Sequence, residues 1–275
     1  MQTALARFAS NRLALAGAAV LLGLIALVAL TPLLYPGDPF ALVGPALQPP
    51  GGQFLLGTDT LGRDVAAEIA YGARTSLIIG LSATGAAILL GTLIGGLAGY
   101  YRGGVEVALM RLTEFFQTIP AFVLAILIVA ILSPSLFSEV VAIAAVSWPG
   151  IARLVRGEFV ALGGREFVLA CDGLGAGDAR IVFRHMLPNC TSAIIAVGTL
   201  LIGTAVLIEA GLAFLGLGDP NVMSWGLIIS SGRAVLRSAW WICAFPGLAI
   251  LLTVLAINLV GDGLNEVLNP RLRER

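Results

Sequence analysis

The chain has 275 residues, of which 58% are hydrophobic and only 12% are charged. Soluble domains carry about 25% charged residues, so this composition indicates a protein that lies in a lipid bilayer. The formal net charge is zero and all 16 basic residues are arginine. This balance gives no reason to expect a nucleic-acid partner, and the lack of lysine excludes an ATP-binding P-loop.

The first apolar run, Leu13–Leu34, follows Arg7 and Arg12. It is longer than the ~7–15-residue core of a cleavable signal peptide, and it meets the ~20 residues that span a bilayer. We therefore expect a retained first membrane helix.

The next segment, up to residue 74, is expected to lie outside the membrane. Five prolines between residues 36 and 50 enforce an extended stretch. The sequence LGTDTLGRDVAAEIAYG (56–72) then has apolar residues every four positions and Gly72 as a terminator. This pattern predicts a short amphipathic helix at 61–71 on the outer surface, which completes an N-terminal unit of residues 1–74.

Residues 75–275 are expected to form one transmembrane domain with five further helices. The apolar runs are Thr75–Tyr101, Phe115–Leu136, Phe137–Ile151, Met186–Ile208 and Ser238–Val260. The run at 137–151 is short and contains Trp148-Pro149-Gly150, so we expect it to be kinked or to extend to Arg156. Residues 219–237 contain NVMSWGLIISSG, which is too short to span, so this segment is expected to be re-entrant or interfacial, with a seventh span as the alternative. The prediction is an all-α polytopic protein with six transmembrane helices.

Three glycines, Gly91, Gly95 and Gly99, recur every four residues in the second run. Such a ridge lets another helix approach closely. We therefore expect it to be a packing surface.

Six spans place both termini on one side of the membrane, and the arginines test this arrangement. Twelve of the 16 fall on the side of the termini, and Arg63, Arg74, Arg233 and Arg237 fall opposite. Because arginine concentrates in cytoplasmic loops, both termini and the loop at about 153–188 are expected in the cytoplasm.

This loop is expected to be a docking surface, because it holds five arginines between two membrane runs. Gly175 and Gly177 permit a sharp reversal, and Asp178 can cap and favourably charge a following helix. The side chains expected to meet a partner are Ile181, Val182, Phe183, Arg180 and Arg184.

No catalytic or metal-ligating constellation emerges around the single histidine, His185, so no enzyme or resident metal is expected. Glu209 lies in an apolar run, where an ionisable residue is a candidate for translocation. The alternative is a packing residue that bonds to a neighbouring loop. Asn258 and Asp262 are expected to form interhelical hydrogen bonds.

The loop resembles the cytoplasmic signature of ATP-binding-cassette (ABC) importer permeases, Glu-Ala-Ala, three residues, Gly, nine residues, Ile-x-Leu-Pro. Here Leu169-Ala170-Cys171 fill the triplet, Gly175 the glycine and His185 the isoleucine position, and Leu187-Pro188 close the motif. The interval from Gly to Pro matches, whereas the glutamate and the isoleucine are replaced.

Two further segments resemble the peptide/nickel permease family. LGTDTLGRD (56–64) is similar to its outer loop. EAGLAFLGLGDPNVMSWG (209–226) and FPGLAILLTVLAINLVGDGLNEVLNPRLR (245–273) are similar to the C-type subunit of dipeptide and oligopeptide permeases. The resemblance covers almost the whole chain in the right order.

The resemblance implies a type I ABC importer permease of the bacterial inner membrane, with a coupling helix seated on an ATPase. Its implied partners are a second homologous permease, two cytoplasmic ABC ATPases that bind the ATP, and an extracytoplasmic solute-binding protein. Peptides are the expected solute, and nickel, another small solute or a stand-alone secondary transporter are the alternatives. The coupling residues would be Ala170, Gly175, Gly177, Asp178, Ala179, Arg180, Arg184 and Pro188.

Overall fold

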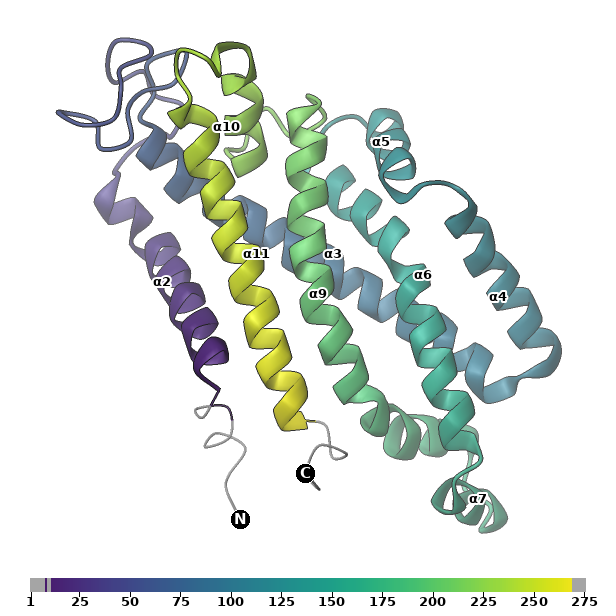
Figure 1. The fold of residues 1–275 in the computed structure, drawn as a ribbon. Coiled ribbons are helices and arrows are strands. Elements are labelled where there is room, and N and C mark those ends of the chain that lie inside the picture. Colours follow the sequence, from purple (N-terminus) through teal and green to yellow (C-terminus); the bar gives the residue numbers. More distant parts are fainter. Residues whose placement is uncertain (1–7, 9–10, 269–275) are drawn as a thin grey trace.

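The structure is a computed structural model that describes residue 8 and residues 11–268. This part of the chain folds into helices joined by loops, which confirms the expected all-α class. Five helices are long and apolar enough to cross a membrane, and a bent helix pair would make a sixth. The long helices run side by side, and α3 crosses behind them obliquely (Figure 1).

Two of the long helices, α2 and α3, begin at side-chain caps. The side chain of Asn11 accepts hydrogen bonds from the first turn of α2 (Arg12–Leu34). Asp64 accepts a bond of 2.9 Å from Ala66 N and starts α3 (Val65–Tyr101). At 37 residues, α3 is about 55 Å long, which exceeds the ~30 Å hydrocarbon thickness.

The separate surface helix predicted at 61–71 is wrong, because most of these residues are the first turns of α3. Gly72 does not end the helix. A Cβ atom there would lie 3.2 Å from the backbone nitrogen of Trp225, so this glycine permits a close approach of another segment. The predicted boundary after residue 74 therefore falls inside a continuous helix.

The run predicted as one span at 115–136 is broken. It contains the end of α4 (Gly103–Thr118) and all of α5 (Ala121–Leu132), which meet at 87°. Pro120 lacks an N–H group, and its ring forces the preceding residue, Ile119, into extended geometry (φ −92°, ψ 130°).

Three further long helices extend beyond the apolar runs that predicted them. α6 (Leu136–Gly163) continues past Arg156, and α9 (Leu187–Phe214) and α11 (Trp241–Leu268) form the rest of the bundle. Between these two, α10 (Trp225–Gly232) and the 3-10 turn η2 (Arg233–Val235) pack at the end opposite to the start of α2 (Figure 1). The 219–237 segment therefore does not supply a seventh span.

The glycine ridge of α3 packs directly on α6, as expected. A Cβ atom at Gly95 would lie 2.2 Å from the carbonyl oxygen of Ala152, and one at Gly99 would lie 2.6 Å from the Cβ of Phe159. Gly91 is equally close to α6. The two helix backbones therefore touch, which fixes α3 against α6.

Candidate functional site

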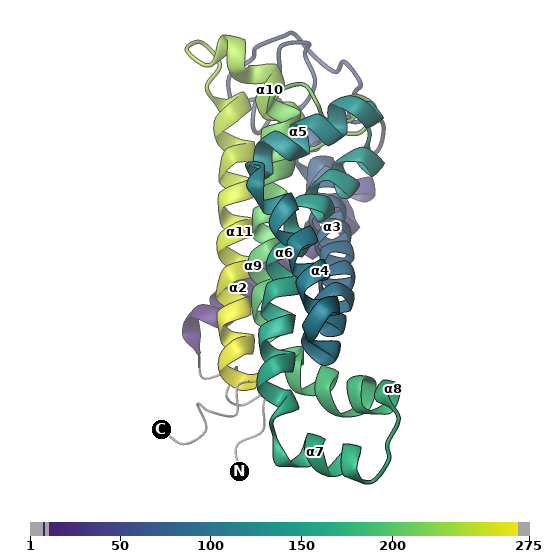
Figure 2. The ribbon, with the colours of Figure 1, turned by 90° about the vertical axis from the view of Figure 1, so that its right-hand side faces the viewer.

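The 164–188 loop lies at the end of the bundle where α2 begins and α11 ends. It contains α7 (Glu166–Gly173), a turn, α8 (Asp178–Arg180) and the π-helical segment η1 (Ile181–Met186), which leads into α9. Figure 2 shows α7 and α8 projecting together beyond the ends of α6 and α9.

The turn after α7 is a Schellman motif. Ala176 N donates to Cys171 O at 3.0 Å, and Gly175 N donates to Asp172 O at 2.8 Å. Gly175 therefore has a left-handed backbone with φ +77°. Gly177 has φ −66°, which any residue adopts, so only Gly175 requires glycine for this reversal.

Asp178 does not cap α8 through its side chain, contrary to our expectation. The N-cap position belongs to Gly177, and no side-chain capping bond is formed there. The Oδ1 atom of Asp178 instead accepts a hydrogen bond of 3.0 Å from the hydroxyl of Tyr100, near the end of α3. Arg102 Nη2 also donates to Val160 O at 2.9 Å, which joins the end of α3 to α6.

The inner face of the loop belongs to a hydrophobic cluster. Val168, Ile181 and Met186 are buried and pack in one group with Phe159 of α6 and Cys190 of α9. Ile181 was expected to meet a partner, but its burial excludes that role in this conformation. This packing makes the loop continuous with the helices that it joins.

The outer face of the loop is apolar and basic. Leu174 is 87% exposed, and Phe183 and Leu169 are 67% and 57% exposed. Of the expected coupling residues, those that are also exposed are Ala170, Gly175, Gly177, Asp178, Ala179, Arg180, Arg184 and Pro188. Three large exposed apolar side chains beside two arginines form a surface that a partner protein can cover.

Pro188 lies in the first turn of α9, directly after η1. Since proline has no N–H group, the usual bond to the carbonyl four residues earlier is lost. Just before it, Leu187 N donates to Val182 O, five residues back. Such π-helical turns often occur at functional sites.

Glu209 lies at a polar contact between three helices, and only one of its two carboxylate oxygens has a hydrogen-bond partner among the described residues. Its side chain is fully buried, and Oε2 accepts a hydrogen bond of 3.0 Å from Ser76 Oγ of α3. Trp225 N of α10 lies 3.4 Å from the same hydroxyl oxygen. This geometry favours packing over translocation for Glu209.

A second buried carboxylate was missed, although it lies inside a predicted span. Glu139, in the first turn of α6, is 1% exposed, and its Oε1 accepts a bond of 3.0 Å from Asp219 N. Asp219 Oδ2 in turn accepts a bond of 3.2 Å from Leu136 N. The two acids attach the loop after α9 to the start of α6, and a carboxylate within an apolar run was the sequence signal for Glu139.

The interhelical bonds expected of Asn258 and Asp262 are not seen in the described residues. Asn258 faces Gly203 of α9, but its Oδ1 has no hydrogen-bond partner there. Asp262 is exposed.

Comparison with known proteins assigns most of the chain. Residues 91–274 match the family described as binding-protein-dependent transport system inner membrane component, and residues 1–51 match the N-terminal TM domain of oligopeptide transport permease C. Two relatives are 42% and 40% identical. They are the di/tripeptide transport system permease protein DppC of Pseudomonas aeruginosa (strain UCBPP-PA14; 97% of this chain, 90% of that protein) and the dipeptide transport system permease protein DppC of Alkalihalophilus pseudofirmus (strain ATCC BAA-2126 / JCM 17055 / OF4; 96% and 87%).

A third relative, the oligopeptide transport system permease protein OppC of Bacillus subtilis (strain 168), is 35% identical over 98% of this chain and 90% of its own length. The fold is similar to that of a chain of the MetNI methionine ABC transporter in an inward-facing conformation. The TM-score is 0.62 at 19% identity, with 74% of this chain and 97% of that chain covered. The fold is therefore that of a type I ABC importer permease, as expected. The matched length and these identities make the chain a member of the binding-protein-dependent transport system inner membrane components.

Proposed function

We propose that this protein is one of two permease subunits of an ABC importer and forms half of a translocation pathway for di- or oligopeptides. The observation that carries the proposal is the 164–188 loop, which exposes an apolar and basic face and is packed into α3, α6 and α9. The three relatives described above are named as peptide permeases, which supports peptides over nickel or another solute.

In this proposal the loop is a lever. A partner ATPase holds the face formed by Leu169, Leu174, Phe183 and the two arginines, and its ATP-driven closure moves the loop. Because Val168, Ile181 and Met186 pack with α6 and α9, movement of the loop is passed to those helices. Coupling requires the ATPase to hold the loop in different positions in its two nucleotide states.

The remaining components follow from the family and from charge. A second homologous permease supplies the other half of the pathway, two ABC ATPases bind the ATP, and an extracytoplasmic protein delivers the solute. This chain itself then needs no cofactor and catalyses no reaction. The excess of arginine at the end that carries the 164–188 loop supports a cytoplasmic position for that loop and for both termini.

A cavity of about 1120 Å³ is the candidate inner end of the proposed pathway. It lies between the ends of α6, α7, α9 and α11, and polar side chains line part of it: Glu158, Asn189, Ser192 and Asn265. In this proposal the cavity lies at the cytoplasmic end of the pathway, where a polar lining suits a solute that is being released.

The test compares the same substitution at two neighbouring glycines. Gly175→Val places a β-branched residue at φ +77°, whereas Gly177→Val leaves a residue at φ −66° with no atom near its Cβ. In proteoliposomes with the partner subunits, we expect Gly175→Val to lose peptide uptake and solute-stimulated ATPase activity while it still inserts. Gly177→Val should retain both.

Normal uptake by Gly175→Val would remove the loop from the mechanism. Uptake that persists without the ATPase subunits would instead favour a stand-alone secondary transporter. Neither result depends on which peptide is used.

A further inference from the structure

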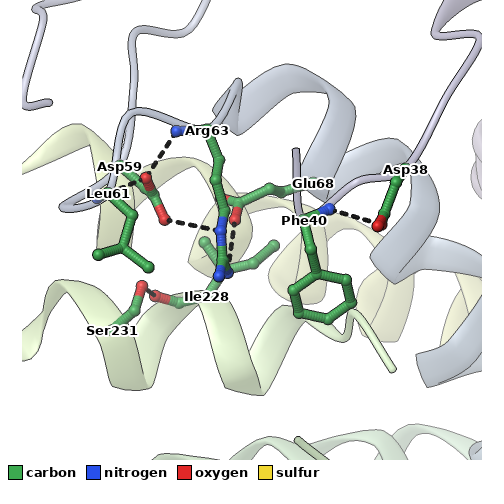
Figure 3. A network of polar contacts seen from close by, with 8 residues as sticks. All are labelled: Asp38, Phe40, Asp59, Leu61, Arg63, Glu68, Ile228 and Ser231. Carbon is green, nitrogen blue, oxygen red and sulfur yellow. Dashed lines mark hydrogen bonds and ion pairs between the residues drawn. The ribbon is translucent and has the colours of Figure 1, made fainter. Parts of the chain in front are cut away.

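A small pocket lies at the opposite end of the bundle, between the outer loop and α10. Its volume is about 250 Å³. Phe40, Arg63 and Glu68 form one side, and Met223, Ile228 and Ser231 form the other. Figure 3 shows Arg63 at the centre of this group, between two carboxylates.

The two carboxylates differ in how well they are satisfied. Asp59 is 1% exposed, and its Oδ1 accepts bonds of 2.8 Å from both Leu61 N and Arg63 N. Glu68 is 2% exposed and receives no hydrogen bond in the part of the chain that the structure describes. Its Oε1 lies 3.9 Å from Arg63 Nη1, and its Oε2 has no partner.

Arg63 does not complete this site. Its Nε lies 4.0 Å from Asp59 Oδ2, beyond hydrogen-bond distance, and has no other partner among the described residues. The guanidinium lies over the ring of Phe40, 4.9 Å from its centroid. One guanidinium therefore faces two buried carboxyl groups, and the carboxyl of Glu68 is left without a hydrogen-bond donor among the described residues.

We propose that this pocket receives a lysine or arginine side chain of the solute-binding protein, with its cationic head at Glu68. The inference rests on the proposed function, which places this end outside the cytoplasm. A buried carboxylate without a donor is costly, and a cation that donates hydrogen bonds removes that cost. The volume is smaller than the ~300–1,000 Å³ of typical small-molecule sites, so it suits one side chain better than a whole peptide.

The test measures the affinity of the cognate solute-binding protein for the full transporter in lipid nanodiscs. Glu68→Gln removes the charge and keeps the shape, and Ser231→Trp fills the pocket and leaves the charge in place. The control is Asp38→Asn, because Asp38 is an exposed acid of the same outer loop (Figure 3). We expect both pocket variants to weaken binding by about tenfold or more and the control to stay within about twofold.

Two further measurements keep the outcomes apart. Binding to the wild-type transporter should weaken with added salt, and this dependence should be smaller for Glu68→Gln. Glu68→Lys should bind least, and a lysine or arginine of the binding protein changed to glutamate should restore its binding. If Glu68→Gln does not assemble with its partners, Ser231→Trp decides.

Unchanged affinity in the pocket variants, while the wild type binds, would overturn this inference and leave the proposed function standing. Absence of any binding by the wild-type transporter would overturn the proposed function itself.

Discussion

Tyr100 of α3 and Asp178 of α8 are 78 positions apart in the chain, and a hydrogen bond of 3.0 Å joins their side chains. It ties the first residue of α8 to the end of the longest helix in the described part of the protein. Through α3, this bond connects the 164–188 loop to the glycine contact with α6.

We predict that Tyr100→Phe weakens this coupling. A hydrogen bond of this kind contributes about 0.5–1.5 kcal/mol, so solute-stimulated ATPase activity should fall several-fold, while the amount of assembled transporter stays the same. The control is Tyr101→Phe, because Tyr101 is the adjacent residue and is 53% exposed. Equal stimulation in both variants would show that the bond carries no coupling.

The exposed apolar face of the loop gives a second prediction. Leu174→Asp should abolish copurification of the ATPase subunits, because a charge would then replace an apolar side chain on the proposed docking face. Leu174 is 87% exposed, so the variant should melt at the same temperature as the wild type when the permease is studied alone. Leu61→Asp is the matched control, since Leu61 is 55% exposed at the other end. Retention of the ATPase by Leu174→Asp would place its docking site elsewhere.

The packing of α3 gives a third prediction. Alanine usually stabilises a helix relative to glycine, by about 0.5–1 kcal/mol. At Gly95, however, a Cβ atom would lie 2.2 Å from a backbone oxygen, so Gly95→Ala should destabilise the protein by about 1–3 kcal/mol. Gly85 of the same helix has no atom within 4 Å of its Cβ position, and Gly85→Ala should not lower the melting temperature. Thermal melts of the purified protein compare the two directly.

Much of the fold follows from the sequence, because apolar runs of span length and the four-residue glycine spacing depend on local pattern. The breaks between helices were harder to place. Glycine is typical of a helix end, but Gly72 instead permits a close approach of Trp225, which is 153 positions away. Pro120 is a sequence signal for the bend between α4 and α5. Because the residues around it are uniformly apolar, the run was nevertheless predicted as one span.

The position of the candidate site could be predicted from the sequence, but which of its residues are buried and which are exposed could not. The motif placed Gly175 and Pro188 in the loop, and the structure gives a backbone reason for each. Ile181 and Phe183 are similar side chains two positions apart, yet one is buried and the other exposed. Only the fold of α7 over η1 decides between them. Likewise, Glu68 has no local signal, since its pocket is closed by α10 from far along the chain.

The contact of α3 with α6 restricts where this subunit can change shape. Side chains between helices can switch rotamers and let the helices slide, but a seam made of glycine backbone offers no such adjustment. We therefore expect α3 and α6 to move as one body, so that a change of shape in this subunit takes place at the contacts of this pair with the other helices.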